Sequence, residues 1–246
     1  MDYARFLEDI QAQYGDKISR SIETSKVYKE FVDGVPSDKT QCECVLLPTD
    51  SVSGAMETAM GRTCILNFAS YKRPGGGFLR GNTTQEESLC GVSTLYPVLK
   101  SFEQSYYNVN RLDLNRGMYT DKAIYSRDVV FFPTGHTPRD FDVLTCAAPN
   151  FSSGRRFGSV SREENYEYLA KRIRFIFDIA ESEGVDCFVV GAWGCGAFKQ
   201  DPGQVAKLLL NACNNTSIKR VVFAIPDADG KKFSAFDYVF KHSGLC

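Results

Sequence analysis

Two adjacent carboxyl side chains, Glu86 and Glu87, follow a run of three glycines and are well suited to acid–base chemistry. The glycines, Gly75, Gly76 and Gly77, come soon after an apolar run that is typical of a buried strand. Glycine takes positive φ at low cost and has no Cβ, so its backbone amides approach a phosphate or a sugar closely. The pattern therefore predicts a ligand-binding loop within residues 70–89, called the first loop below, that leads to a pair of carboxyls.

A second interpretation of the carboxyl pair needs no ligand. Thr84 and Glu87 have the spacing of a capping box, in which two side chains close the first turn of a helix. Acidic residues are also common in a first helical turn, because they interact favourably with the helix dipole. The pattern alone leaves both roles of Glu87 open, and capping is the more frequent of the two.

A second glycine-rich loop covers residues 191–202. Gly191, Gly194 and Gly196 precede an expected helix start, where free backbone N–H groups can form a cradle for an anion. The spacing matches neither G-x-G-x-x-G nor a phosphate loop ending in Gly-Lys-Ser/Thr, which disfavours a dehydrogenase and a P-loop nucleotidase. Asp201 fits the N-cap of the following helix.

The cysteines and histidines predict neither a thiol nucleophile nor a metal site. A cysteine nucleophile normally needs a histidine base, and neither His136 nor His242 has a sequence context that places it beside Cys195. Only Cys42 and Cys44 resemble a pair of metal ligands. We therefore expect no metal and no covalent cysteine chemistry.

The bulk composition excludes several classes of function. Lys and Arg total 29 against 30 Asp and Glu in 246 residues, so no electrostatic basis exists for direct nucleic-acid binding. The nine scattered cysteines are expected to be reduced thiols, as in cytosolic or nuclear proteins. The opening run MDYARFLEDI lacks the order of a signal peptide, and no uncharged run approaches the roughly 20 residues that span a bilayer. We expect a soluble monomer in the cytoplasm or nucleus, neither secreted nor membrane-bound.

Short apolar runs alternate with helical segments along most of the chain. The strand-like runs cover residues 44–49, 64–69, 129–133, 141–148, 187–192 and 220–225, and the helical segments lie near 51–60, 84–100, 161–183 and 202–214. The clearest helix begins with a capping box at Ser161 and Glu164 and ends before Gly184. The alternation predicts an α/β fold with a mixed sheet covered on both faces, and ligands in such folds bind at the carboxyl ends of the strands.

Two segments fall outside this alternation. Residues 2–33 are predicted to be helical and to end near Gly34, which gives an N-terminal helical extension over residues 1–36, packed on a main domain of residues 37–246. Residues 101–127 carry several tyrosines without a clear period and are predicted to be an insertion or a long ordered loop.

The run LNFASYKRPGGGFLRGNTTQEESLC resembles the signature of the microbial-type poly(ADP-ribose) glycohydrolases, a branch of the macrodomain superfamily. The signature is three glycines, a spacer of seven residues and Gln-Glu-Glu. The run GAWGCGAFKQDP resembles the diphosphate-binding loop of the same family, and the late run VVFAIPD also fits. The resemblance covers about residues 43 to 230. It implies a three-layer α/β/α macrodomain, and it favours the catalytic interpretation of Glu87.

The resemblance also implies roles for individual residues. Cleavage of a glycosidic bond passes through an oxocarbenium-like state, in which the leaving group needs a proton and the anomeric carbon then needs water. Glu87 would serve both steps as general acid and then base, and Glu86 would bind a hydroxyl of the distal ribose. Asn67 would orient that ribose, and Phe198 would lie beside the scissile sugar. The other implied substrate contacts are Gly75, Gly76, Gly77, Gln85, Gly194, Cys195, Gly196 and Ala197.

Some contacts are left open by the resemblance. Ala197 stands where a larger aliphatic residue is expected, and the residues around the adenine are not assigned, with Asp50 and Asn150 as candidates.

The implied activity is hydrolysis of the bond that links ADP-ribose to poly(ADP-ribose) or to a modified protein side chain, without a cofactor. The expected partners are ADP-ribose, ADP-ribosylated proteins and the polymer. The main alternative is a macrodomain that binds ADP-ribose without cleaving anything, and a second is a related hydrolase acting on another nucleotide-sugar linkage. Residues 1–36 and 101–127 are expected to shape the rim of the site, where the choice among polymer, arginine, serine and acidic linkages is made.

Overall fold

The computed structural model describes residues 2–32, 41–226 and 230–243. Within these residues a mixed sheet of seven strands has the order β1-β4-β5-β3-β6-β7-β2. The strands are β1 (Lys26–Tyr28), β2 (Glu43–Leu47), β3 (Thr63–Phe68), β4 (Ala123–Phe131), β5 (Arg139–Cys146), β6 (Cys187–Val190) and β7 (Arg220–Ala224). The five strands from β5 to β2 are parallel, and β4 runs antiparallel to both of its neighbours.

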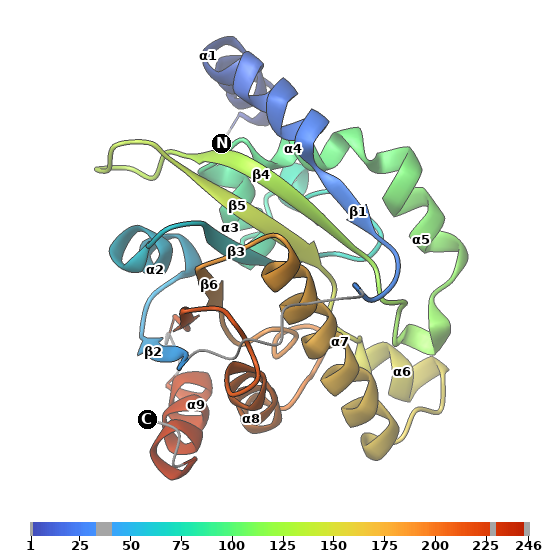
Figure 1. Cartoon of the computed structure of the whole chain (residues 1–246). Helices are drawn as coiled ribbons and strands as arrows, with labels where there is room; N and C mark the ends of the chain where they lie inside the picture. The colour runs from blue at the N-terminus through green and yellow to red at the C-terminus, as the bar shows by residue number, and fades with distance from the viewer. Residues whose placement is uncertain (1, 33–40, 227–229, 244–246) are drawn as a thin grey trace.

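Helices cover both faces of the sheet and give the molecule three layers (Figure 1). One face carries α1 (Tyr3–Thr24), α2 (Ser51–Thr58), α3 (Gln85–Gly91) and α4 (Leu95–Ser101), and the other carries α7 (Arg162–Ser182), α8 (Pro202–Cys213) and α9 (Lys231–His242). Each layer of helices encloses its own apolar core, because the central strands are buried on both faces. The predicted three-layer α/β architecture with a mixed sheet is confirmed.

The N-terminal segment differs from the prediction. Helix α1 is bent at Tyr14, where φ is −126°, and it ends at Thr24. The chain then forms strand β1, which pairs antiparallel with β4 over Lys26–Tyr28. A continuous helix over residues 2–33 is therefore wrong. Pairing with β4 outweighs helix propensity here, because strand formation depends on the neighbouring strand. The predicted end near Gly34 lies outside the described residues.

The prediction of a long ordered loop over residues 101–127 is wrong, and the alternative that the segment is an insertion stays a prediction. The segment contains a π-helical turn (Glu103–Tyr107), helix α5 (Asn108–Leu112), a 3₁₀ turn (Asn115–Gly117) and the first part of β4. Strand β4 begins at Ala123, well before the predicted start at 129, and Ala123, Ile124 and Tyr125 are fully buried. These residues face the two apolar cores alternately, so no polar alternation marks the strand in the sequence.

The predicted helix over 84–100 is divided in two. Residues Val92 to Thr94 leave the helix and pair with β4, where the Thr94 amide donates to the Val130 carbonyl at 2.9 Å. The Val130 amide in turn donates to the Thr94 hydroxyl at 3.0 Å. These bonds fix the directions of α3 and α4, and with them the position of the carboxyl pair at the start of α3.

The remaining helices agree with the sequence in part. Helices α7 and α8 are confirmed, with the Ser161 hydroxyl accepting from the Glu164 amide at 3.0 Å and Gly184 at φ 71° beyond the end of α7. The 3₁₀ turn Phe78–Arg80, α6 (Phe151–Phe157) and α9 were not predicted. None of the helices in the described part of the chain combines the length and apolar character needed to cross a bilayer.

Candidate active site

The two glycine-rich loops leave the sheet at the same edge. Strands β3 and β6 are parallel neighbours, so the loops that follow them emerge side by side. A Cβ at Gly191, where the second loop begins, would lie 3.2 Å from the ring of Phe68 at the end of β3. The second loop is also tied to the start of α6, because the Ser152 amide donates to the Phe198 carbonyl at 3.0 Å.

The glycine triplet makes room for the two carboxyls. Gly75 and Gly76 have φ of +62° and +59°, a region that favours glycine. A Cβ at Gly76 would lie 2.6 Å from Glu87 Oε1 and 2.8 Å from Glu86 Oε2. A Cβ at Gly75 would lie 2.7 Å from the ring of Tyr96. The triplet therefore lets the backbone of the first loop approach both acids. The presence of three glycines thus has a steric explanation in addition to the predicted approach of a ligand.

Glu87 is held both by the first loop and by the N-cap residue of its own helix. Its side chain is buried, with 7% of the residue exposed. Its Oε1 accepts from the Gly77 amide at 2.7 Å, and its Oε2 accepts from the Thr84 hydroxyl. Thr84 is the N-cap of α3, but its side chain makes no hydrogen bond to the amides of the first turn. The reciprocal bonds of a capping box are missing between these described residues, so the capping-box interpretation of Glu87 is wrong, although Glu87 does lie in the first turn of α3, where an acidic residue interacts favourably with the helix dipole.

Glu86 is buried more deeply, with 2% of the residue exposed. Its Oε2 accepts from the Ser70 amide at 2.7 Å, and its Oε1 accepts from Asn67 Nδ2 at 3.4 Å. Burial raises the pKa of the Glu86 carboxyl from 4.5 to about 8, against the lowering effect of these hydrogen bonds, and the charge of Glu87 raises it further. At pH 7 most of Glu86 is therefore protonated and can donate a hydrogen bond to a ligand hydroxyl.

Asn67 lies beneath the carboxyl pair on β3. It is fully buried opposite Thr145 on β5, and its Nδ2 donates to the Thr145 hydroxyl at 3.2 Å as well as to Glu86. Its Oδ1 has no hydrogen-bond partner among the described residues. A buried oxygen without a donor is uncommon in proteins, and it is suited to accept a bond from a ligand hydroxyl.

Gln85 joins the start of α3 to the end of β3. Its Oε1 accepts from the Phe68 amide at 2.8 Å, and its Nε2 donates to the Leu66 carbonyl at 2.9 Å and to the Ser51 hydroxyl at 3.1 Å. The amide of Gln85 is thus fully engaged in positioning the two glutamates that follow it.

The second loop presents free amides. Several of its backbone N–H groups make no hydrogen bond to any described residue, among them those of Gly194, Gly196, Ala197 and Phe198. The Cys195 amide is different, because it donates to the Ala192 carbonyl at 3.1 Å. Gly194 has φ +75°, and a Cβ there would lie 2.9 Å from Ala148. This arrangement is what a phosphate-binding cradle before a helix requires.

The thiol of Cys195 does not have the properties of a nucleophile. It is half-buried, and burial raises its pKa to about 12. A reactive cysteine needs a lowered pKa. A contribution of Cys195 to ligand binding would therefore come from its place in the loop and not from a thiolate.

Phe198 belongs to an aromatic cluster that the sequence did not indicate. It packs edge-on against Tyr119, with ring centroids 5.9 Å apart, and Tyr119 stacks on Tyr71 at 4.1 Å. Asn150 Nδ2 donates to the Tyr119 hydroxyl at 3.2 Å. Tyr119 was visible only as one of several tyrosines in residues 101–127.

Trp193 is fully buried in the core, and its Nε1 donates to the Cys146 carbonyl at 3.2 Å.

Residues 6–134 match the family model described as the microbial-type PARG catalytic domain, and PARG stands for poly(ADP-ribose) glycohydrolase. The chain belongs to this family. The matched part includes the glycine triplet and the carboxyl pair, so the predicted family resemblance is confirmed.

Solved structures of bacterial PARG proteins have the same fold. The enzyme from Thermomonospora curvata bound to the inhibitor ADP-HPD is 26% identical, with a TM-score of 0.83, over 96% of this chain and 97% of that one. The enzyme from Deinococcus radiodurans in complex with ADP-ribose is 29% identical, with a TM-score of 0.79. The match covers 93% of this chain and 98% of that one. A comparison with curated protein sequences gives no match. The macrodomain-like fold is confirmed, and the similarity extends over the second loop as well.

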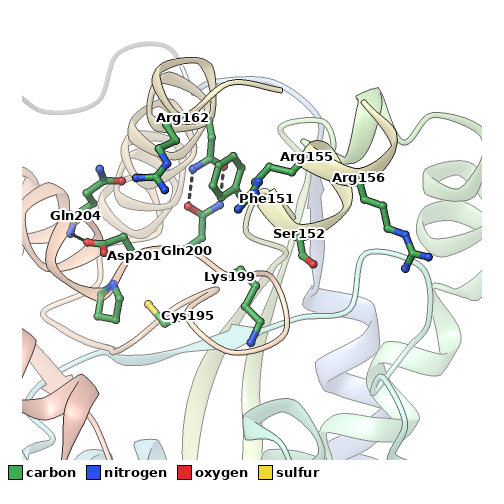
Figure 2. A pocket seen from close by; sticks show the side chains of 12 residues that line it. Phe151, Ser152, Arg155, Arg156, Arg162, Cys195, Lys199, Gln200, Asp201 and Gln204 are labelled. Atoms are coloured by element: carbon green, nitrogen blue, oxygen red, sulfur yellow. Dashed lines mark hydrogen bonds between the residues drawn. The ribbon is translucent and has the colours of Figure 1, made fainter. Parts of the chain in front are cut away.

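This member of the PARG family has a basic pocket beside its second loop (Figure 2). The pocket has a volume of about 620 Å³ and lies between the second loop and helices α6, α7 and α8. Its cationic lining residues are Arg155, Arg156, Arg162 and Lys199. The buried amides of Gln200 and Asn165, which hydrogen-bond each other at 2.9 Å, also line it. No residue of the first loop lines this pocket, so it is separate from the carboxyl pair.

The two candidates for adenine contacts both cap helices. Asp50 Oδ1 accepts from the amides of Val52 at 2.9 Å and Ser53 at 3.1 Å at the start of α2. Asn150 Oδ1 accepts from the Ser153 amide at 3.0 Å at the start of α6. These helix-capping bonds explain the presence of both side chains without a contact to adenine.

Proposed function

We propose that this chain binds ADP-ribose between the two loops and hydrolyses the glycosidic bond that joins it to poly(ADP-ribose). The observation that carries the proposal is the buried pair of Glu86 and Glu87, packed against Gly76 in a chain of the PARG family. A domain that only bound ADP-ribose would need the loops but not two buried carboxyls. Burying carboxyls costs free energy, and a catalytic role explains why the fold bears that cost.

Glu87 is the proposed general acid and base. Its protonated carboxyl gives a proton to the leaving oxygen as the bond from that oxygen to the anomeric carbon breaks. A water molecule then attacks the anomeric carbon, and the Glu87 carboxylate takes a proton from it. After the two steps the carboxyl of Glu87 is protonated again, as it was before the reaction. The bonds from Gly77 and Thr84 fix the direction of the carboxyl, which proton transfer requires.

Glu86 and Asn67 are the proposed contacts to the distal ribose. Glu86 is mostly neutral at pH 7 because its pKa is about 8, so its carboxyl can donate a hydrogen bond to a ribose hydroxyl. The unpartnered Oδ1 of Asn67 offers an acceptor at the same place. Together the two side chains supply a donor and an acceptor for the hydroxyls of one sugar.

The second loop is the proposed diphosphate site. The free amides of Gly194, Gly196, Ala197 and Phe198 offer donors without a bulk positive charge, which agrees with the net charge of −1 for the whole chain. Phe198, half-buried against Tyr119, is the proposed cover of the sugar beside the scissile bond. Of the other predicted contacts, the glycine triplet serves as the opposite wall, and Gln85 acts by positioning the acids.

Residues 1–36 and 101–127 would act on specificity through the first loop. The Tyr3 ring of α1 packs edge-on against Phe78 with centroids 4.9 Å apart, and Phe78 follows the glycine triplet. From the other segment, Asn110 Nδ2 donates to the Tyr71 carbonyl at 3.1 Å and Arg111 Nε donates to the Lys72 carbonyl at 2.9 Å. The two segments thus hold the first loop from two directions.

The basic pocket favours a polymer over a single ADP-ribose group. Each further unit of the polymer adds a diphosphate, and the pocket beside the second loop offers four cationic side chains. We infer that the pocket receives an anionic part of the polymer that lies beyond the bound unit. A substrate with one ADP-ribose on an arginine or serine side chain would leave it unused.

Release of free ADP-ribose from a panel of conjugates tests the function. The panel contains the polymer and single ADP-ribose groups linked to arginine, serine and an acidic side chain. We expect release from the polymer at a higher kcat/KM than from the others. Tight ADP-ribose binding without release from any conjugate would identify a binding module. Release only from a single linkage would show that the basic pocket has another role.

A further inference from the structure

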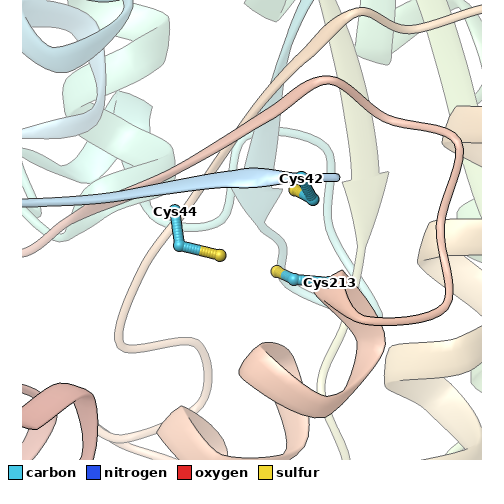
Figure 3. Close-up of side chains that lie close together, drawn as sticks. All are labelled: Cys42, Cys44 and Cys213. Atoms are coloured by element: carbon cyan, nitrogen blue, oxygen red, sulfur yellow. The ribbon is translucent and has the colours of Figure 1, made fainter. Parts of the chain in front are cut away.

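Three cysteines meet at the end of the sheet opposite the two glycine loops. Cys42 and Cys44 lie on either side of Glu43, at the start of β2, and Cys213 is the last residue of α8. The three sulfur atoms all lie within 4.8 Å of one another, and Figure 3 shows the side chains converging from the strand and the helix. Neither the predicted chemistry nor the proposed function uses these thiols.

The fold explains why the sulfurs converge. Side chains two residues apart in an extended strand point to the same side, so Cys42 and Cys44 face one layer of helices. Strand β2 pairs in parallel with β7, Cys44 lying beside Val221, and α8 covers the same face. Cys213 is buried, whereas Cys42 and Cys44 are half-buried because β2 is an edge strand. The cluster is therefore enclosed on the side of α8 and reachable from the edge of the sheet.

The spacing suits a thiophilic metal ion. Zinc binds thiolate sulfur at about 2.3 Å, which puts three sulfurs on one ion roughly 3.8–4.0 Å apart. Sulfurs within 4.8 Å of one another reach that spacing through small side-chain rotations. Among the described residues no other group of three potential ligands comes together, although Cys64, Cys90, Cys146, Cys187 and Cys195 are also present.

We propose that Cys42, Cys44 and Cys213 bind one thiophilic divalent metal ion, of which Zn²⁺ is the type. Each thiol releases its proton to solvent as its sulfur becomes a ligand, so binding weakens as the pH falls. Water takes the remaining coordination position. The ion ties the edge strand β2 to the end of α8, and its place at the far end of the sheet separates it from the hydrolysis of the glycosidic bond.

A disulfide is the competing outcome for these thiols. It would join two of the three sulfurs, would need an oxidant, and would leave the third cysteine free. The two outcomes differ in mass, in absorbance and in the number of cysteines they need. A metal site requires all three thiols, whereas a disulfide requires only two.

Titration of the full chain with Cd²⁺ tests the proposal. The protein is reduced, freed of metal and kept under a non-thiol reductant, and the sulfur-to-cadmium charge-transfer absorbance is followed. We expect saturation at one equivalent and displacement by Zn²⁺. Each of Cys42→Ser, Cys44→Ser and Cys213→Ser should weaken binding by more than the roughly 10–100-fold that loss of an outer-shell partner costs. Cys187→Ser, a matched change of a buried thiol elsewhere in the sheet, should bind Cd²⁺ as the wild type does.

Two results would overturn the metal site. One is the absence of a charge-transfer band in the wild type. A band of equal strength in the variant with all three cysteines changed to serine would have the same meaning. The other is a mass lower by two hydrogen atoms after oxidation of two thiols by oxygen in air, together with no metal binding by the reduced protein, which would identify a disulfide. ADP-ribose binding by each serine variant, together with circular dichroism, separates loss of the metal site from loss of the fold.

Discussion

The backbone amide of Gly77 donates a hydrogen bond of 2.7 Å to the carboxyl of Glu87. This bond links the first loop directly to the proposed acid, ten residues further along the chain. Any displacement of the first loop therefore moves the acid as well. The relationship explains why the glycine triplet and the acid occur together in one motif, since each is needed for the geometry of the other.

Replacement of Gly76 by alanine should damage both stability and catalysis. The new Cβ would lie 2.6 Å from Glu87 Oε1, at a residue whose φ is +59°. We expect a loss of about 2 kcal/mol in the free energy of unfolding. Displacement of the acid should lower ADP-ribose release on the order of 100-fold. Chemical denaturation and a turnover assay measure the two effects.

Gly196→Ala is the matched control for the stability effect. A Cβ at Gly196 has no atom within 4 Å, and its φ is not positive. The free energy of unfolding of this variant should equal that of the wild type. Equal losses in both alanine variants would contradict the steric account of the triplet.

The Thr84 hydroxyl should matter for catalysis more than for the helix. It donates to Glu87 and caps no amide, so Thr84→Val should leave the stability nearly unchanged. Loss of this hydrogen bond, which helps to fix the direction of the Glu87 carboxyl, should lower kcat roughly 10-fold. Ser161→Ala is the control, because Ser161 does cap α7 and its loss should cost about 1 kcal/mol of stability without changing kcat. A stability loss of that size in Thr84→Val would restore the capping interpretation.

Glu86 should make the stability depend on pH. Its folded pKa of about 8 lies above the ordinary value of 4.5, so the protonated form is favoured in the fold. Its favourable contribution is complete below about pH 4.5 and is lost as the pH rises to about 8. Glu86→Gln should remove this dependence, and the wild type should lose on the order of a few kcal/mol relative to the variant across that range. Denaturant unfolding of both proteins at pH 5 and pH 8 measures this, and parallel pH profiles would refute it.

Changes in the basic pocket should affect hydrolysis of the polymer and not of single ADP-ribose conjugates. The double variant Arg155→Ala with Arg156→Ala should raise KM for the polymer about 10-fold and leave single ADP-ribose conjugates unaffected. The difference should shrink at high salt, because exposed charges are screened. A variant with Arg174→Ala and Lys207→Ala makes the same change in charge at exposed positions outside this pocket. Equal effects of the two double variants would show a general charge effect instead of a binding pocket.

Much of the fold follows from local patterns. The strands β2, β3, β5, β6 and β7 were predicted within a few residues, because each is a short apolar run between turn signals. The placement of both glycine loops at one edge also followed, since parallel strands end together. Helix α7 was predicted with both of its ends, because its capping residue and its final glycine lie within one stretch of sequence.

The elements that were missed depend on distant partners. Strand β1 exists because β4 pairs with it, and no local feature of Lys26–Tyr28 indicates this. Tyr119 reaches Phe198, and Cys213 reaches Cys44, only through the folded sheet. The true contacts of Glu87 were equally hidden, because the sequence pattern of a capping box is the same whether or not the side chains form one.

The most direct test of the central claim compares wild type with Glu87→Gln for both ADP-ribose binding and release of ADP-ribose from the polymer. Glutamine keeps the shape of the side chain and can keep the bond from Gly77, but it cannot transfer a proton. We predict that binding changes little and that the release rate falls about 100-fold or more. Full turnover by Glu87→Gln would show that another group supplies the proton and would contradict the assignment of Glu87 as the catalytic acid.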